Sequence, residues 1–526
     1  MTKIWERYST KLAENKFDAI IIGSGMGGLS TAAFLSKAGK KVLVLERHFK
    51  VGGWTHTFQR GKYEWDVGIH YIGAVGRKSA FLRKLFDEVT EERLEWAPMP
   101  DNYDRMIFPD KSYNFVAGKD RFIDQMVDYF PNERKAIEKY LDLVKQCTRA
   151  SAKFFMNRAM PKMISDLTYG PMSRSFLEMS DKTTWDVLSS LTDNQELIGV
   201  LTGQYGDYGL TPKQSSFAIN AVVANHYLYG GYYPVGGSRM IAENIAPVIQ
   251  QSGGKIVVNA TVDEILIHKN KAVGVKLENG DELMAPLVVS SAGVGITFGK
   301  LAKGVASYEK KLEQVEPSCA HVCLYIGMNE TAENMGLEAT NLWVYPGYDH
   351  DANVENYLND PSKSFPMVYM SFASAKDPTW TEKHGQTATM EAITLAPYEM
   401  FSKWEKTSWK KRGDDYDALK DHLTNRLMNY VYANVPQVEG YVDHVELSTP
   451  LTTRDFLGYD QGEIYGVNHT PSRFRQKWLR PQTPVKHLYL TGQDIVTDGV
   501  GGALMSGVIT SSAILKRNVM KQILAS

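Results

Sequence analysis

The chain is poor in the features that mark secreted, membrane-spanning and nucleic-acid-binding proteins. Its 526 residues contain three cysteines, which are too few for a disulfide framework and are typical of a reducing compartment. No stretch reaches the ~18 consecutive apolar residues that a transmembrane helix needs. The formal net charge is -1, so there is no overall basic field with which to bind a phosphate backbone. We therefore expect no nucleic acid as a partner.

A secretory signal and a metal site are also not expected. Met1 to Lys16 mixes polar and charged residues and has no apolar core, so it does not have the pattern of a signal peptide. Cys319-Ala320-His321-Val322-Cys323 contains metal-ligand residue types, but residues 317–328 alternate like a strand and offer no second ligand pair. The sequence therefore predicts a cytoplasmic protein without a bound metal.

Glycine is concentrated in a turn between two apolar runs near the N-terminus. Asp18 to Ile22 is typical of a strand buried on both faces, and a helix is expected from Gly27 to Lys37. A second strand, Val42 to Leu45, ends at the acid Glu46. The G-x-G-x-x-G spacing between strand and helix indicates a dinucleotide diphosphate site, with Glu46 placed to bind a ribose diol. The turn consists of Gly23, Ser24, Gly25, Met26, Gly27 and Gly28.

This unit alone is compatible with NAD or FAD, and later segments favour FAD. A second glycine pair, Gly52-Gly53, follows Glu46 closely and would bring more backbone to the cofactor, as in flavoproteins of the glutathione reductase type. Near the C-terminus, a predicted strand ends in Gly492-Gln493-Asp494, and the glycine-rich segment 499–503 opens the last helix. Because no second G-x-G-x-x-G unit is present, NAD(P)H is expected only as a transient reductant.

Together with the middle of the chain, these segments resemble a known family. The chain is similar to the flavin amine oxidase and phytoene desaturase superfamily, and within it to the retinol saturase branch. The most discriminating block is Asp66-Val67-Gly68-Ile69-His70-Tyr71-Ile72-Gly73. The other segments that carry the resemblance are 52–58, Asn225-His226-Tyr227, 233–238, 448–452, 465–469 and 490–494.

The resemblance and the order of predicted elements imply an α/β fold. We expect a glutathione-reductase-type, Rossmann-like FAD-binding domain assembled from residues 17–75, 232–297 and 479–526. Residues 76–231 are expected to form a helical cap that can face a membrane, with a long helical region from Ser79 to about Tyr229. Residues 298–478 are expected to form a substrate domain with a mixed antiparallel sheet.

The resemblance also implies which residues form the site. The candidate catalytic residues are His70, Tyr71, His226 and His469, whose neutral rings suit an apolar tunnel better than a carboxylate would. The expected FAD-binding residues are Gly23, Ser24, Gly25, Met26, Gly27, Gly28, Glu46, Arg47, Gly53, Trp54, Thr55, His70, Tyr71, Val262, Gly492, Asp494, Gly501, Gly502 and Ala503.

The resulting hypothesis is an FAD-dependent oxidoreductase that acts on C=C bonds of a long apolar substrate. A retinoid, a carotenoid or other terpenoid, and an unsaturated fatty-acyl lipid all remain open, and saturation by hydride from reduced flavin is favoured. The alternatives are carotenoid desaturation or redox-neutral cis/trans isomerisation, and a lipid-binding flavoprotein carrier.

A membrane surface is a further expected partner. Residues 149–176 place Phe and Met side chains next to Lys and Arg, a pattern of an interfacial helix or of a core helix.

Overall fold

A six-stranded parallel sheet organises the nucleotide-binding part of the chain. The computed structural model describes residues 4–525, so the first three residues of the polar N-terminal segment, and Ser526, lie outside it. Ile21 lies opposite Val44 and Val289 in the sheet, and these strands are buried on both faces, as their apolar runs predict. The strand order is β1 (Glu6–Arg7), β11 (Lys255–Val258), β3 (Val42–Leu45), β2 (Ala19–Ile22), β15 (Val288–Ser290) and β21 (Leu488–Leu490).

Helices from three distant parts of the chain pack together beside this sheet. The glycine-opened helix α1 (Met26–Lys37) contacts both α9 (Arg239–Gln251) and α18 (Gly499–Leu515). Next to them lie α2 (Phe81–Thr90) and α19 (Val519–Ala525). The predicted strands at 18–22 and 42–45 and the helix after the glycine turn are therefore confirmed.

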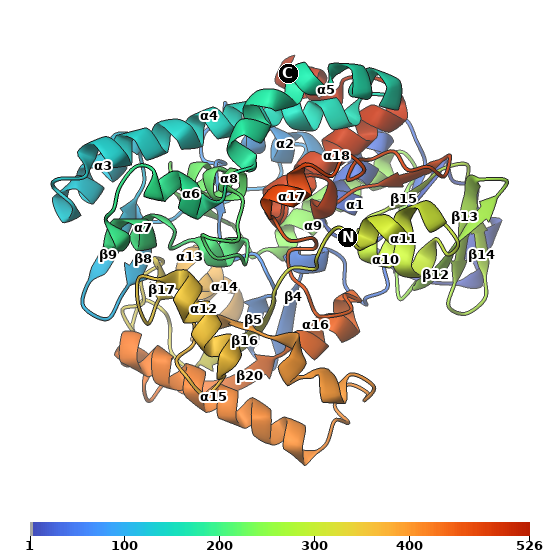
Figure 1. Cartoon of the computed structure of the whole chain (residues 1–526). Helices are drawn as coiled ribbons and strands as arrows, with labels where there is room; N and C mark the ends of the chain where they lie inside the picture. Colours follow the sequence, from blue (N-terminus) through green and yellow to red (C-terminus); the bar gives the residue numbers. More distant parts are fainter. Residues whose placement is uncertain (1–3, 526) are drawn as a thin grey trace.

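Three smaller sheets flank the parallel sheet. One is formed by β12 (Val262–His268), β13 (Lys271–Leu277) and β14 (Glu282–Met284), at the right of Figure 1. The second joins β10 (Gly231–Pro234) to β6 (Ile72–Gly73) and β7 (Trp96–Pro98), and the third is the hairpin of β4 (Thr57–Arg60) and β5 (Tyr63–Asp66).

A seven-stranded mixed sheet forms the second layer of the molecule. Its pairs are antiparallel except for the parallel pair β17–β8, and α15 (Asp414–Asn434) packs against it at the bottom of Figure 1. The predicted strands at 319–328, 367–373 and 388–395 are confirmed in this sheet. Its order is β20 (Val442–Ser448), β16 (Ala320–Met328), β19 (Ala388–Ala396), β18 (Val368–Ser371), β17 (Asn341–Val344), β8 (Asn102–Ile107) and β9 (Ser112–Val116).

The prediction of a long helical region from Ser79 to about Tyr229 is wrong between residues 96 and 116. This stretch forms β7, β8 and β9, and the last two complete the seven-stranded sheet. In β8, Asp104 lies opposite Asn341 of β17, a partner far away in the sequence. Because the pairing is long-range, the local pattern of residues 102–116 does not reveal it.

The remainder of the segment 119–227 is helical and lies across the upper side of the molecule in Figure 1. Its helices are α3 (Lys119–Tyr129), α4 (Arg134–Ala159), α5 (Lys162–Ser180), α6 (Thr184–Ser189), α7 (Gln195–Leu201) and α8 (Phe217–Tyr227). Two further helices are α12 (His350–Asn359) and α16 (Pro450–Leu457). The remaining α-helices are short: α10 (Val294–Ile296), α11 (Ala306–Leu312), α13 (Ala373–Lys376), α14 (Trp380–His384) and α17 (Pro471–Phe474).

A buried arginine connects this helical layer to the C-terminal part of the chain by hydrogen bonds. Arg158, near the end of α4, donates to the carbonyl oxygens of Leu479 at 2.8 Å, Ile495 at 3.2 Å and Phe474 at 3.3 Å. Its guanidinium also lies 4.6 Å from the centroid of the Phe154 ring. Arg158 therefore satisfies three carbonyls of a segment that leads to the parallel sheet.

We expect Arg158→Ala to destabilise the protein by about 3 kcal/mol, because it leaves buried carbonyl oxygens without a donor. The measurement is urea unfolding followed by circular dichroism. The matched control is Arg174→Ala on α5, since Arg174 is exposed and pairs with Glu178 one helical turn away. The control should lose roughly 0.5 kcal/mol or less. Equal losses in the two variants would contradict the anchoring role of Arg158.

Candidate functional site

One continuous cavity of about 630 Å³ runs from the glycine turn after β2 toward the seven-stranded sheet. At one end it is lined by backbone of the turn and by the acidic end of β3. At the other end the lining is largely apolar and aromatic and consists of Trp343, Met367, Tyr369, Ile393 and Leu395. The cavity therefore joins a nucleotide-type cradle to an apolar chamber.

The cradle is made by backbone segments that approach one another closely. A Cβ atom at Gly27 would lie 2.6 Å from Cα of Gly492, and one at Gly53 would lie 2.9 Å from Cα of Gly25. Gly53 also has a φ of +57°, in the left-handed region. The N-cap of α1 is Gly25, which has no capping side chain, so the first N–H groups of the helix are left for a ligand. Such a helix N-terminus is suited to bind a diphosphate.

Most of the predicted cofactor residues line this cavity. The exceptions are Ser24, Gly28, Gly501 and Gly502. A Cβ atom at Gly28 would lie 2.1 Å from the carbonyl oxygen of Gly23, and one at Gly502 would lie 2.2 Å from that of Thr497, so these two glycines are needed for packing. The predicted residues in the lining are Gly23, Gly25, Met26, Gly27, Glu46, Arg47, Gly53, Trp54, Thr55, His70, Tyr71, Val262, Gly492, Asp494 and Ala503.

The two acids that line the cradle are oriented by hydrogen bonds. Glu46 accepts from the backbone N–H and the hydroxyl of Ser24, at 2.8 and 2.7 Å, and from the backbone N–H of His48 at 2.8 Å. Ser24 thus acts on the site through Glu46. Asp494 accepts from the N–H groups of Val294 at 2.7 Å and Val467 at 3.0 Å. Both carboxylates are therefore held in fixed positions at the wall.

His70 lines the cavity and has a buried acid behind it. Its Nδ1 lies 3.9 Å from Oε2 of Glu391, and neither carboxylate oxygen of Glu391 has a hydrogen-bond partner among the described residues. Burial, with a smaller effect of the Lys376 charge, lowers the pKa of His70 to about 3. Burial also raises the pKa of Glu391 well above its usual value. The imidazole and the carboxyl group therefore face each other in their neutral forms.

Tyr71 and Tyr227 form a stacked pair at the cavity wall, with ring centroids 4.1 Å apart. The Tyr71 hydroxyl donates to Oδ2 of Asp104 at 2.9 Å. Burial raises the pKa of both phenols well above 10. Tyr71 is therefore a neutral side chain that links the cavity to a buried carboxylate.

His226 and His469, the other two predicted catalytic residues, lie outside the cavity lining. Nε2 of His226 accepts from the backbone N–H of Gly73 at 2.8 Å. Nε2 of His469 accepts from the backbone N–H of Asp498 at 3.1 Å, and its Nδ1 lies 3.4 Å from Nη1 of Arg473. Both rings satisfy backbone groups next to the site, so their burial serves the scaffold.

A buried network that sequence reasoning missed lies beneath Tyr71. Lys376 at the end of α13 donates to Oδ1 of Asn341, to the hydroxyl of Ser371 at 2.8 Å and to the carbonyl oxygen of His70 at 3.1 Å. Nδ2 of Asn341 donates in turn to Oδ1 of Asp104 at 2.9 Å. Burial lowers the pKa of Lys376 to about 8, although nearby carboxylates oppose this shift.

The missed residues carry only weak sequence signals. Asp104 lies in a stretch without clear alternation, and Lys376 is one of two adjacent charges, with Asp377, after a largely apolar run. Asp207, which also lines the cavity, lies in a short turn without any motif. The two cysteines considered for a metal are free thiols, Cys319 half-buried and Cys323 buried in β16.

Comparisons with known proteins agree with this geometry. The model of the flavin containing amine oxidoreductase family matches residues 26–297. Human all-trans-retinol 13,14-reductase is 37% identical, over 98% of this chain and 88% of that protein. A zebrafish protein described as an inactive all-trans-retinol 13,14-reductase is 32% identical, over 97% and 88%. Prolycopene isomerase 1 of an Oncidium hybrid cultivar is 27% identical, over 86% and 75%.

Solved structures share the fold. An oxidoreductase from Methanosarcina mazei gives a TM-score of 0.61 at 16% identity and covers 95% of this chain and 100% of that one. A putrescine oxidase bound to putrescine gives 0.61 at 15% identity, over 96% and 100%. These likenesses confirm the predicted fold class.

The chain belongs to the flavin containing amine oxidoreductase family. Within it, the match over nearly the whole length to all-trans-retinol 13,14-reductases confirms the predicted retinol saturase branch. The cradle fits the flavin cofactor of this family, because close glycine contacts leave backbone N–H groups open and because two fixed acids stand at its ends. The protein is thus a flavin-dependent oxidoreductase.

We expect Gly53→Ala to weaken flavin binding at least tenfold, because the new methyl group would press against Gly25 in the cradle. The matched control is Gly61→Ala. Gly61 has the same φ of +57°, and a Cβ atom there would meet nothing within 4 Å. The control therefore carries the backbone strain alone and should bind flavin like the wild type. The flavin-to-protein absorbance ratio and a flavin titration measure both. Equal affinities would contradict the role of close backbone approach.

Proposed function

We propose that this protein is an FAD-dependent reductase that saturates a C=C bond of a long apolar substrate of the retinoid or carotenoid class. The observation that carries the proposal is the continuity of the cavity, which leads from the nucleotide cradle into a chamber walled by Trp343, Tyr369 and Ile393. A bound flavin supplies two-electron hydride chemistry. The aromatic and aliphatic walls bind the substrate and exclude water from the reacting atoms.

The extent of the cradle supports FAD over a mononucleotide. Beyond the diphosphate turn, the lining continues to Glu46 and Arg47 and to Ala260 and Val262. A carboxylate at the end of the second strand is placed to accept hydrogen bonds from the ribose of a dinucleotide. The backbone near Val262 then serves the adenine. In FMN neither of these groups would have a ligand atom to contact.

His70 and Tyr71 are proposed to orient the substrate and the flavin ring. Both line the cavity in neutral form, which suits an apolar substrate because no charge has to be desolvated when it binds. The main chain of His70 is also fixed by Lys376, which donates to its carbonyl oxygen. This contact holds the His70-Tyr71 segment against the seven-stranded sheet.

Saturation, isomerisation and ligand carriage would give different results in one experiment. Photoreduced enzyme is mixed anaerobically with all-trans-retinol or with a cis-carotene, and flavin reoxidation and product mass are followed. We expect reoxidation in a single turnover together with a product that has gained two hydrogen atoms. A product of unchanged mass would instead support isomerisation, as the name of the Oncidium relative suggests. Retention of the ligand without flavin reoxidation would support a carrier.

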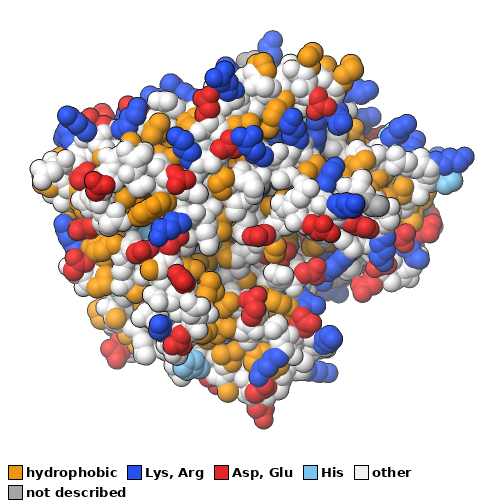
Figure 2. All heavy atoms as spheres, in the orientation of Figure 1, with side chains coloured by type: hydrophobic (Ala, Val, Ile, Leu, Met, Phe, Trp, Pro, Cys, Tyr) orange, Lys and Arg blue, Asp and Glu red, His pale blue; other side chains and the backbone are white. Residues whose placement is uncertain are grey.

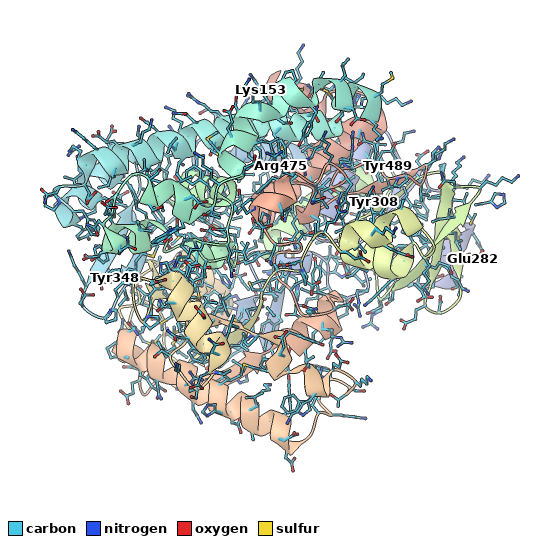
Figure 3. The ribbon with its side chains drawn as sticks, in the orientation of Figure 1. Lys153, Glu282, Tyr308, Tyr348, Arg475 and Tyr489 are labelled. Atoms are coloured by element: carbon cyan, nitrogen blue, oxygen red, sulfur yellow. The ribbon has the colours of Figure 1, made fainter. Side chains whose placement is uncertain are left out.

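A membrane surface is the proposed source of the substrate. On α5, Met163 is 83% exposed, Ile164 46% and Leu167 82%, and we call these three side chains the α5 patch. Figure 2 shows orange side chains over this upper edge, with Lys and Arg beside them. Exposed basic residues there include Lys162 and Lys153, and Lys153 lies on the outer side of α4 in Figure 3. Apolar groups flanked by cations suit an anionic lipid interface.

The phenylalanines of the sequence segment 149–176 lie in the core. Phe154, Phe155 and Phe176 are buried and their rings contact one another, with those of Phe154 and Phe176 stacked at a centroid distance of 4.3 Å. The interpretation as a core helix therefore fits the buried face of the pair α4 and α5. The proposed interfacial helix concerns the exposed face of the same pair. Among residues 4–525, no helix combines the length and apolar character required to cross a bilayer.

We expect the double variant Met163→Ser, Leu167→Ser to bind vesicles containing phosphatidylglycerol at least tenfold more weakly, because each lost side chain removes about 1 kcal/mol or more of apolar transfer. Sedimentation with vesicles measures the binding. The control is Leu358→Ser on α12, since Leu358 is 55% exposed but lies outside the patch. If the patch variant sediments like the wild type, the patch does not contact lipid.

A further inference from the structure

Two carboxyl groups, the buried Asp104 and the half-buried Asp207, share the hydroxyl of Tyr71. That hydroxyl lies 2.9 Å from Oδ2 of Asp104 and 3.4 Å from Oδ2 of Asp207. Asp104 is fully buried in β8, whereas Asp207, at the end of the short turn η3 (Tyr205–Asp207), lines the cavity. Only the second of these acids can therefore reach a substrate.

The surroundings favour different protonation states for the two acids. Asp104 accepts hydrogen bonds from Asn341 at 2.9 Å, Gln204 at 2.8 Å and Tyr71, and Asn341 connects it to the Lys376 ammonium. Burial raises the pKa of Asp104, and these three donors and the nearby cation oppose that shift and favour the ionised form. Asp207 has only the long contact to Tyr71 among the hydrogen bonds found in the described residues. It has no cation beside it to offset the cost of burying a charge.

The single proton of the Tyr71 hydroxyl sharpens this difference. Because that proton is directed to the closer Asp104, the Tyr71 oxygen can serve Asp207 only as an acceptor. A protonated Asp207 carboxyl group can then donate to the Tyr71 oxygen across this contact. Two acids whose surroundings separate their protonation states are the arrangement from which enzymes obtain one ionised and one proton-donating carboxyl group.

We propose that Asp207 is the catalytic acid that delivers a proton to the substrate alkene, and that Tyr71, held by Asp104 and Lys376, positions it. The inference rests on the proposed alkene reductase function and assigns its proton source. In the reaction the alkene π bond breaks as one carbon accepts a hydride and the other accepts the Asp207 proton. The alkene gains two electrons, the reduced flavin that supplies the hydride is oxidised, and the Asp207 carboxylate regains a proton from water.

The pH dependence follows from the groups that face Asp207. Burial is the main cause that raises the pKa of Asp207 well above its usual value, and Asp104 and Asp498 add to the shift. Since the protonated form donates, the rate should be full at low pH and fall as pH rises through this pKa. Other groups near Asp207 can also titrate, so the profile needs variants. They are the phenols of Tyr71, Tyr208, Tyr227, Tyr345, Tyr369 and Tyr465, the Lys376 ammonium and Asp498.

The test is single-turnover reoxidation of photoreduced, flavin-loaded enzyme by all-trans-retinol across a pH series. We expect Asp207→Asn to slow reoxidation 10²- to 10⁴-fold, the usual contribution of a general acid, and to lose the alkaline fall in rate. Retinol affinity should change little. Asp207→Glu should recover part of the rate because it restores a carboxylic acid. The matched control is Asp351→Asn, because Asp351 is another partly buried aspartate with a raised pKa but lies outside the cavity lining.

A second readout does not depend on turnover. Infrared spectra of the oxidised holoenzyme near neutral pH should contain the C=O band of a protonated carboxylic acid that shifts in D2O and is missing in Asp207→Asn. If no such band belongs to Asp207, or if Asp207→Asn reoxidises like the wild type, the assignment is wrong. Loss of rate in Glu391→Gln in its place would assign the proton to the Glu391–His70 pair. If the wild type itself reduces no alkene, the proposed function fails first.

Discussion

The whole site depends on the contact of main chain with main chain at the glycine turn. Gly27 approaches Gly492 from the end of the sequence, and Gly53 approaches Gly25 within the N-terminal part, each at a distance that no Cβ atom could occupy. These contacts fix α1 relative to β21 and thereby determine the direction of the cavity. Since the helix N-terminus is left uncapped by side chains, the same geometry that closes the fold also leaves N–H groups for the diphosphate.

The second constraint is the presence of ionisable groups in a largely apolar interior. Lys376, Asn341 and Asp104 satisfy one another in a chain of hydrogen bonds that crosses from α13 to β17 and β8. An isolated charge in this position would be costly, and the pairing reduces that cost. The network also contacts two residues of the cavity lining, His70 and Tyr71. Lys376 donates a hydrogen bond to the carbonyl oxygen of His70, and Asp104 accepts one from the hydroxyl of Tyr71. Its polar character is thus used to fix the cavity wall.

The local sequence identifies the segments of the cradle better than those of the chamber. The turn at residues 23–28, the acid Glu46 and the strand before Asp494 each carry their own pattern, so the segments that form the cradle could be predicted from the sequence. Strands β8 and β9 could not, because β8 is stabilised by its parallel partner β17 and not by its own periodicity. Asp104, Asp207 and Lys376 come from three separate segments and meet only through that pairing. His226 and His469 are the opposite case. They lie in segments with a clear sequence pattern, but their rings accept hydrogen bonds from backbone N–H groups next to the site.

The position of β8 therefore connects fold and chemistry. Had residues 102–107 been helical, as the surrounding sequence suggests, Asp104 would not lie opposite Asn341 and its carboxylate would have no route to the Lys376 charge. Tyr71 would then lose its acceptor, and its hydroxyl proton would be free for Asp207. The strand thus sets which of the two acids is the nearer acceptor of the Tyr71 hydroxyl. A long-range backbone pairing far from the cofactor cradle in this way determines the hydrogen-bond partners of a residue in the cavity wall.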